Sequence, residues 1–112
     1  MALDSHLDVA VTETAVTFTF TVTNADTEPV DLEFPSGMVT DIAVYTGDRE
    51  CWRWSDGKLF TQAIETETLA PGESFVQEGT WQDPPPGEYI AEAWLEARTL
   101  RPTGRSEFVV QP

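Results

Sequence analysis

The chain has 112 residues, 20 of them acidic and six basic, which gives a formal net charge of -14 at neutral pH. A chain of this length fits one domain, residues 1–112, whose core needs neither a metal ion nor a disulfide. Its negative field repels phosphate backbones and anionic lipids, which argues against nucleic acids and membrane surfaces as partners.

The N-terminal segment, Met1 to His6, lacks the basic start and the apolar stretch of a secretion signal. No segment further along approaches the roughly 18 apolar residues that a membrane-spanning helix needs. Cys51 is the single cysteine, so no disulfide forms within the chain, and we expect this thiol to be packed instead of reactive. These features predict a cytoplasmic protein, and we expect a monomer.

The segment from Ala15 to Asn24 alternates apolar residues with threonine, which predicts a half-buried β-strand. The segment before it, His6 to Glu13, alternates as well, and the short connection at Glu13 and Thr14 predicts a hairpin. The side chains expected to face the core are Leu7, Val9 and Val11 in the first segment and Val16, Phe18, Phe20 and Val22 in the second.

Six further strand-like runs follow, separated by Gly, Pro, Asp and Asn, at residues 30–34, 38–45, 50–54, 74–81, 87–96 and 105–110. Pro71 and Gly72 occupy the central positions of a predicted type II turn. This rhythm predicts an all-β fold, an antiparallel β-sandwich of about seven to nine strands. Helix signals allow at most one short helical turn, in the loop from Lys58 to Glu67 or from Glu96 to Pro102.

The sequence contains few candidate residues for catalysis or metal binding. His6 is the only histidine and lies near the N-terminus, while Ser55 and Asp56 fall in a predicted turn, where we expect their side chains to cap backbone amides. Cys and His are too few for a zinc site, and no calcium-loop motif occurs. A weak cation site or, preferably, a solvated acidic face is predicted for Asp26, Glu28, Asp31 and Glu33. We therefore predict a protein that is not an enzyme and has no metal site.

The segment W-R-W-S-D-G-K-L-F-T-Q-A, from Trp52 to Ala63, joins two tryptophans to a predicted turn and to the only lysine of the chain. Period-two alternation places both indoles on one face of a strand, and Ser-Asp-Gly has the residue types that reverse a backbone. Large side chains on firmly held loops concentrate binding energy. The candidate partner-binding residues are therefore Trp52, Trp54, Ser55, Asp56, Gly57, Lys58, Leu59 and Phe60.

A structural interpretation of the same segment remains open. In it, the two tryptophans and Phe60 seal one end of the core, while Lys58 and Leu59 stay exposed. Trp81 and Trp94 lie within alternating strands, and we predict that both pack in the core.

Three stretches carry a resemblance to a known family: V-x-N-A-D-T-E-P-V-D-L-E-F-P-S-G-M from Val22 to Met38, the S-D-G-K-L-F-T-Q motif, and L-A-P-G-E-S from Leu69 to Ser74. Together with the strand from Tyr89 to Trp94, they make the chain resemble the BsuPI family of intracellular proteinase inhibitors over most of its length. The resemblance implies an immunoglobulin-like β-sandwich that inhibits an intracellular serine protease of the subtilisin type and needs no cofactor.

The resemblance does not identify the inhibitory loop. A substrate-like inhibitor offers a rigid segment whose central side chain fills the primary pocket of the protease, and a subtilisin-like pocket favours large apolar groups. We rank the segment Lys58 to Phe60 first, Gln82 to Glu88 second and Thr99 to Pro102 third. The alternative function is a noncatalytic interaction or assembly module that docks through a sheet edge or the segment from Trp52 to Phe60.

The acidic residues are spread along the whole chain among apolar positions, as on the surface of a folded domain. Self-repulsion destabilises such a surface in dilute buffer, and molar salt shortens the screening length to about 3 Å. We therefore interpret the composition as halophilic, with an ordinary acidic mesophilic protein as the alternative.

This interpretation predicts that the melting temperature rises between low and molar KCl, because screening removes repulsion from the compact state more than from the expanded one. Thermal unfolding followed by circular dichroism checks it. A melting temperature that stays constant or falls over this range would reject salt adaptation.

Overall fold

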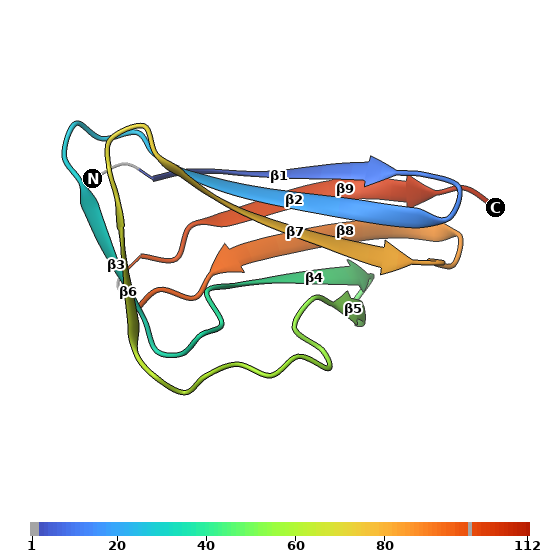
Figure 1. Cartoon of the computed structure of the whole chain (residues 1–112). Coiled ribbons are helices and arrows are strands. Elements are labelled where there is room, and N and C mark those ends of the chain that lie inside the picture. Colours follow the sequence, from blue (N-terminus) through green and yellow to red (C-terminus); the bar gives the residue numbers. More distant parts are fainter. Residues whose placement is uncertain (1–2, 99) are drawn as a thin grey trace.

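The computed structural model describes residues 3–98 and 100–112, and every regular element within them is a β-strand. Figure 1 shows the nine strands: β1 (Leu3–Val11), β2 (Ala15–Asn24), β3 (Val30–Phe34), β4 (Thr40–Thr46), β5 (Arg49–Arg53), β6 (Glu65–Leu69), β7 (Ser74–Gln82), β8 (Gly87–Leu95) and β9 (Thr103–Val110). Over these described ranges, no helix is long and apolar enough to cross a membrane.

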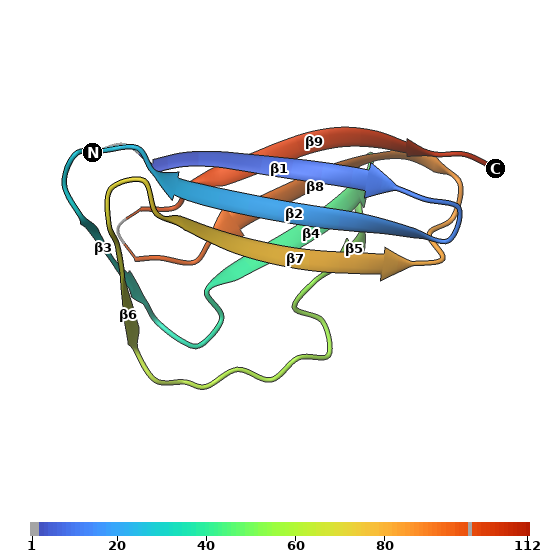
Figure 2. The same ribbon diagram turned by 45° about the horizontal axis from the view of Figure 1, so that its top comes forward.

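Two antiparallel sheets face each other as the layers of a β-sandwich. One has the strand order β1-β2-β7 and the other the order β5-β4-β8-β9. A two-stranded sheet, β3-β6, stands across one end of both layers, on the left in Figures 1 and 2. The predicted antiparallel sandwich is therefore confirmed.

The core follows from the alternation in β2. Every second side chain of this strand is buried, and the four apolar ones, Val16, Phe18, Phe20 and Val22, have no exposed surface. They face the buried side chains of the other layer, which include Ile42 and Val44. Burying side chains of this size stabilises the folded state by about 1.5–3 kcal/mol each, so the predicted inward face of β2 anchors the sandwich.

The two long sides of the sandwich are closed in different ways. On one side β1 lies against β9, and the hydroxyl groups of Ser5 and Ser106 donate across to the carbonyl oxygens of Thr103 and Leu7, at 2.5 and 2.6 Å. On the other side lie the edge strands β7 and β5. There a Cβ atom on Gly79 of β7 would lie 2.6 Å from Cδ1 of Trp54 and 3.3 Å from Cη2 of Trp52. Two indoles thus fill the space that the glycine leaves.

Two turns form where the sequence predicts them. The amide of Glu73 donates to the carbonyl of Ala70 at 2.9 Å, and Gly72 has φ of 81°, which confirms the type II turn. The amide of Thr12 donates to the carbonyl of Ala15 at 2.9 Å, which closes the predicted hairpin between β1 and β2.

Three sequence predictions were wrong. Strand β6 was expected to lie in a loop, because four of its five residues are exposed and no apolar alternation marks it; pairing with β3 creates the strand. Val11, expected in the core, is 42% exposed because it is the last residue of β1, which lies at the edge of its sheet. Trp94 is half-buried on the outer face of β8, since Tyr89, Ala91, Ala93 and Leu95 take the inward positions.

The contact at Gly79 predicts that Gly79→Ala destabilises the fold by about 1–3 kcal/mol, because the added methyl group overlaps Trp54 and forces the indole or the backbone to move. Urea unfolding followed by tryptophan fluorescence measures the change. The neighbouring Thr80→Ala, at an exposed position, is the control and should change the free energy of unfolding by less than about 0.5 kcal/mol. Equal stability of the two variants would contradict the close approach.

Candidate partner-binding loop

The β5–β6 loop, residues 54–64, leaves the four-stranded sheet and crosses to the sheet at the end of the sandwich. Figure 1 shows it in green along the lower side of the molecule, outside both layers. It contains most of the predicted partner-binding residues, and β5 supplies Trp52. The predicted residues, which are neighbours in the sequence, thus lie at the end of β5 and in the loop that follows it.

A tight turn opens the loop, as predicted for Ser55, Asp56 and Gly57. The amide of Lys58 donates to the carbonyl of Ser55 at 3.1 Å, and Gly57 has φ of 76°, a conformation that glycine adopts without steric cost. Asp56 and Gly57 are exposed, so the turn faces solvent.

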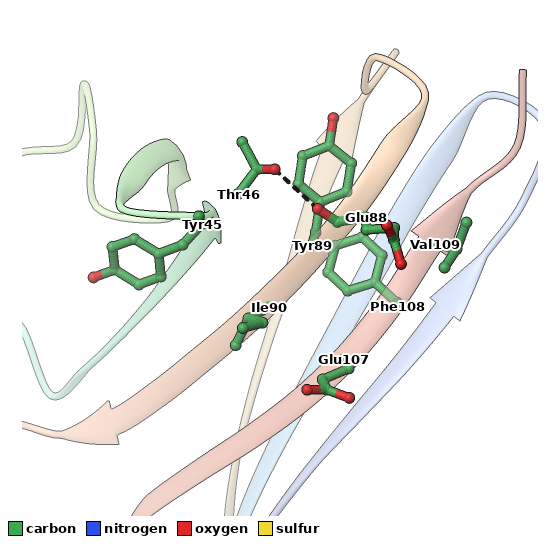
Figure 3. Close-up of a pocket in the computed structure, with 9 residues that line it drawn as sticks. Tyr45, Thr46, Glu88, Tyr89, Ile90, Glu107, Phe108 and Val109 are labelled. Carbon is green, nitrogen blue, oxygen red and sulfur yellow. Dashed lines mark hydrogen bonds between the residues drawn. The ribbon is translucent and has the colours of Figure 1, made fainter.

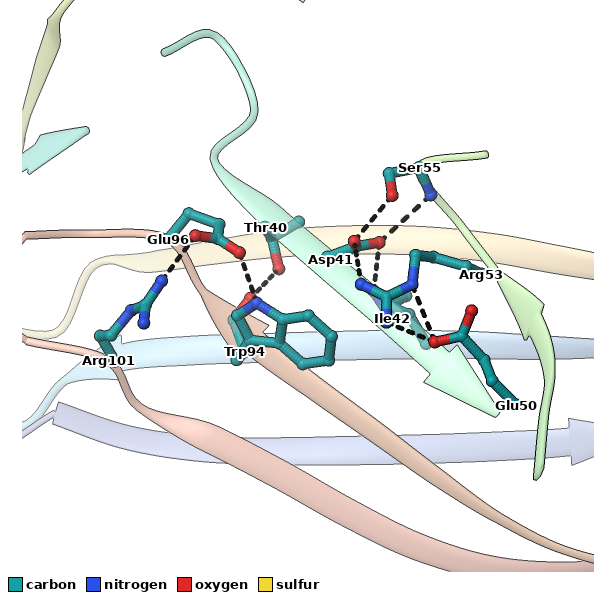
Figure 4. Close-up of polar contacts among 9 residues, drawn as sticks. All are labelled: Thr40, Asp41, Ile42, Glu50, Arg53, Ser55, Trp94, Glu96 and Arg101. Atoms are coloured by element: carbon teal, nitrogen blue, oxygen red, sulfur yellow. Dashed lines mark hydrogen bonds and ion pairs between the residues drawn. The ribbon is translucent and has the colours of Figure 1, made fainter. Parts of the chain in front are cut away.

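The carboxylate of Asp41, on β4, holds this turn from inside. Its side chain is 1% exposed, and it accepts hydrogen bonds from the amide of Ser55 at 3.1 Å, the hydroxyl of Ser55 at 2.7 Å and the amide of Ile42 at 2.9 Å. A guanidinium nitrogen of Arg53 lies 3.2 Å away (Figure 4). Ser55 thus binds a buried carboxylate with its hydroxyl, instead of capping a backbone amide as predicted.

Asp41 was not among the residues predicted from the sequence. The available signal was an acidic residue inside the apolar run from Thr40 to Val44, because a carboxylate buried in a strand must find donors. The sequence does not say which donors it finds. Ser55 lies 14 residues further along the chain, and only the pairing of β4 with β5 brings it within reach.

Arg53 has its charge satisfied within the molecule. Its guanidinium binds Glu50 and Asp41 and lies 5.4 Å from the ring centroid of Trp94. The hydrogen bond to Glu50, together with the charges of both carboxylates, raises the pKa of Arg53, and the same hydrogen bond lowers the pKa of Glu50. The indole nitrogen of Trp94 donates in turn to Glu96 at 2.5 Å (Figure 4). This network joins β5 to β4 and β8.

The two tryptophans of the segment have different roles. Trp52 stacks on Phe18 and Trp81, with ring centroids 5.3 and 6.5 Å apart, and so completes the core. Trp54 lies over Gly79 and is contacted from the loop by Phe60, at 5.9 Å between centroids, and by the Lys58 ammonium, at 4.9 Å from the ring. Both indoles thus pack against the core, as in the structural interpretation, and Trp54 also supports the loop.

Leu59 points away from this support and is 99% exposed. Its neighbours Lys58 and Phe60 both contact the Trp54 ring. Successive side chains thus point to opposite sides of the segment, as they do in an extended chain. One residue later, the carbonyl of Thr61 accepts a hydrogen bond from the amide of Gly37 at 2.9 Å. A projecting apolar side chain is therefore held between anchored residues on both sides.

The other two candidate loops lack such a side chain. In the segment 82–88, the hydroxyl of Tyr89 donates to the carbonyl of Pro85 at 2.6 Å, and no large apolar side chain projects. In the third segment, Thr99 lies outside the described residues, and Leu100 packs against the core. Among the described residues of the three loops, Leu59 is the side chain best placed for a partner's pocket.

Outside the loop, the described residues form a hollow and carry several surface carboxylates. A hollow of about 500 Å³ opens between β4, β8 and β9 (Figure 3), but no Ser, Cys or His occurs among its lining residues: Tyr45, Thr46, Gly47, Glu88, Tyr89, Ile90, Glu107, Phe108 and Val109. Across residues 3–98 and 100–112, no three His, Cys, Asp or Glu side chains converge as metal ligands. Of the four carboxylates considered for a cation, Asp31 accepts from Thr68 and Glu33 lies near Arg98. The β5–β6 loop thus remains the candidate site.

A sequence model of the BsuPI family, described as intracellular proteinase inhibitor, matches residues 3–100. The match covers most of the 112-residue chain, including the β5–β6 loop. No curated protein sequence matches the chain significantly.

Solved structures share the fold. The CARDB domain of the PF1109 protein from Pyrococcus furiosus, in complex with di-metal ions, matches with a TM-score of 0.54 and 16% identity over 98% of this chain and 93% of that one. A β-glucosidase from Kluyveromyces marxianus, in complex with glucose, gives a TM-score of 0.54 and 14% identity over 99% of this chain. This chain spans 14% of the length of that enzyme. At such identities the likeness shows the immunoglobulin-like fold alone.

The buried carboxylate predicts that Asp41→Asn destabilises the protein by about 3 kcal/mol, because the amide cannot accept all the hydrogen bonds and removes one of the two carboxylates that pair with Arg53. It should also speed hydrogen exchange at the amide of Ser55. Urea unfolding and exchange measured by NMR check both effects. Asp56→Asn, which removes an exposed charge from the same turn, is the matched control and should do neither.

Proposed function

The chain belongs to the BsuPI family of intracellular proteinase inhibitors, and from this premise we propose that it blocks a cytoplasmic serine protease of the subtilisin type. In this proposal the β5–β6 loop enters the active-site cleft and Leu59 fills the primary pocket. The protein itself catalyses nothing. The other candidate partner-binding residues support the loop: Trp52, Trp54, Ser55, Asp56, Gly57, Lys58 and Phe60.

The observation that carries this proposal is the placement of Leu59. Its side chain is 99% exposed, although leucine is an apolar residue that a folded protein usually buries. The residues on either side of it pack on Trp54. A partner that buried this side chain would gain its transfer free energy, about 1.5–3 kcal/mol, without having to order the loop.

Rigidity of the loop supports an inhibitor more than a substrate. Asp41 fixes its first turn, Trp54 holds its middle, and the bond between Gly37 and Thr61 fixes the segment after Leu59. A segment held in one conformation loses little entropy on binding and dissociates slowly. A mobile loop would be cut and released.

A second candidate function rests on a different observation. β7 is a nine-residue edge strand that contains one charged residue, Glu78, and no proline or lysine, and its Val76 is 56% exposed. Such an edge lacks the usual protection against pairing with another chain. It supports a noncatalytic assembly module that adds a strand from a partner protein at this edge.

The inhibitor proposal predicts that Leu59→Asp weakens inhibition about 100-fold or more, because the change removes the apolar side chain and offers a charge to an apolar pocket. Inhibition constants against several subtilisin-type proteases, measured in molar KCl, test it. Ile64→Asp is the matched control, since Ile64 is an exposed apolar residue of the same loop, and it should inhibit like the wild type.

Two outcomes would favour the assembly module. One is a wild-type protein that leaves all the proteases tested fully active. The other is a purified, nonproteolytic partner that binds the wild type and Leu59→Asp equally but loses binding to Val76→Lys, on the β7 edge.

A further inference from the structure

We infer that the bond between Leu59 and Phe60 is cut reversibly by the bound protease, and that the cut chain stays folded and inhibitory. This inference rests on the proposed function, since it concerns the same loop. It adds a reaction, cleavage and resealing of one peptide bond, and identifies the structural features that make the reaction reversible.

The topology keeps the two halves together after a cut. The Leu59–Phe60 bond lies between β5 and β6, so one product would contain β1 to β5 and the other β6 to β9. Each of the three sheets contains strands from both products: β2 pairs with β7, β3 with β6 and β4 with β8. Separation of the halves would require the disruption of all three sheets and of the shared core.

The local contacts keep the two new chain ends close to each other. On the amino side of the bond, Lys58 donates from its amide to Ser55 and places its ammonium 4.9 Å from the Trp54 ring. On the carboxyl side, Phe60 packs on the same indole and Thr61 is bonded to Gly37. None of these contacts involves the scissile bond itself, so each can persist after cleavage. The ends then meet at a high effective concentration.

Cleavage and resealing need the protease and water as the only other reactants. The protease serine attacks the Leu59 carbonyl, forms an acyl-enzyme and releases the Phe60 amine, which stays anchored beside it. Attack by water on the acyl-enzyme gives the cut chain, with a new carboxylate on Leu59 and one water consumed. Attack by the Phe60 amine instead restores the peptide bond and frees the serine. From the cut chain, attack of the serine on the protonated Leu59 carboxyl group releases that water and forms the acyl-enzyme again, so the same amine attack reseals the bond. A tethered amine competes with water because its contacts already orient it.

The experiment measures cleavage starting from the intact chain and resealing starting from the cut chain. The full-length protein is incubated in molar KCl with a catalytic amount of a subtilisin that it inhibits, and denaturing mass spectrometry measures intact and cut chains over time. The purified cut form is then treated with fresh enzyme. We expect the same final ratio of intact to cut chain from both starting points. The cut form should elute as one folded species and inhibit like the intact protein.

A variant at Lys58 tests the contacts that hold the new chain ends, without changing Leu59, the side chain proposed to fill the protease pocket. Lys58→Met removes the ammonium from the Trp54 ring while keeping an unbranched side chain, and should shift the final ratio about two- to fivefold toward the cut form. Arg101→Met removes one positive charge from a different loop, where Arg101 pairs with Glu96, and should leave the ratio unchanged.

Failure of this inference is distinct from failure of the proposed function. Inhibition without cleavage at Leu59–Phe60, or cleavage that runs to completion and releases separate halves, would overturn the inference and leave the inhibitor proposal standing. A wild-type protein that inhibits no subtilisin-type protease would reject both.

Discussion

One contact closes the open side of the sandwich: the indole of Trp54 lies where the side chain of residue 79 would be, and glycine leaves that space empty. The opposite side is joined by hydrogen bonds between β1 and β9, but β7 and β5 are both edge strands. Closure therefore depends on Trp52 and Trp54, which fill the space over Gly79. Because Trp54 also supports Lys58 and Phe60, the packing that completes the fold is the packing that presents Leu59.

The charged residues near the β5–β6 loop fix its first turn and the strand before it. In a chain of net charge -14, burial of one more carboxylate is costly unless donors surround it, and Asp41 finds them in Arg53, Ser55 and the backbone. Arg53 in turn binds Glu50 and lies over Trp94, so its charge is used to fasten β5 and is not free for a partner. In the proposed function, the loop thus meets its partner mainly through an apolar side chain, with hydrophobic burial as the main favourable term.

The fold by itself does not identify the activity. Similar sandwiches occur in a β-glucosidase and in a CARDB domain, with which the chain shares little sequence. The family match associates the chain with proteinase inhibition. The β5–β6 loop is the part of the structure whose geometry fits this association. Recognition on a frame of this kind resides in connections, because the strands hold them in place while their side chains remain free to vary.

The sequence alone determined the elements whose side chains alternate between core and solvent: β2 with Val16 to Val22, the β1-β2 hairpin, and turns in which glycine needs positive φ, such as Gly57 and Gly72. It also brought out the segment from Trp52 to Phe60, since its residue types are unusual for a solvated loop. Tertiary structure decided the rest. β6 exists because β3 pairs with it, Trp94 faces outward because Ala91 and Ala93 take the core positions, and Asp41 meets Ser55 only through sheet pairing. Local patterns record the preferences of neighbouring residues, whereas these contacts join positions far apart in the chain.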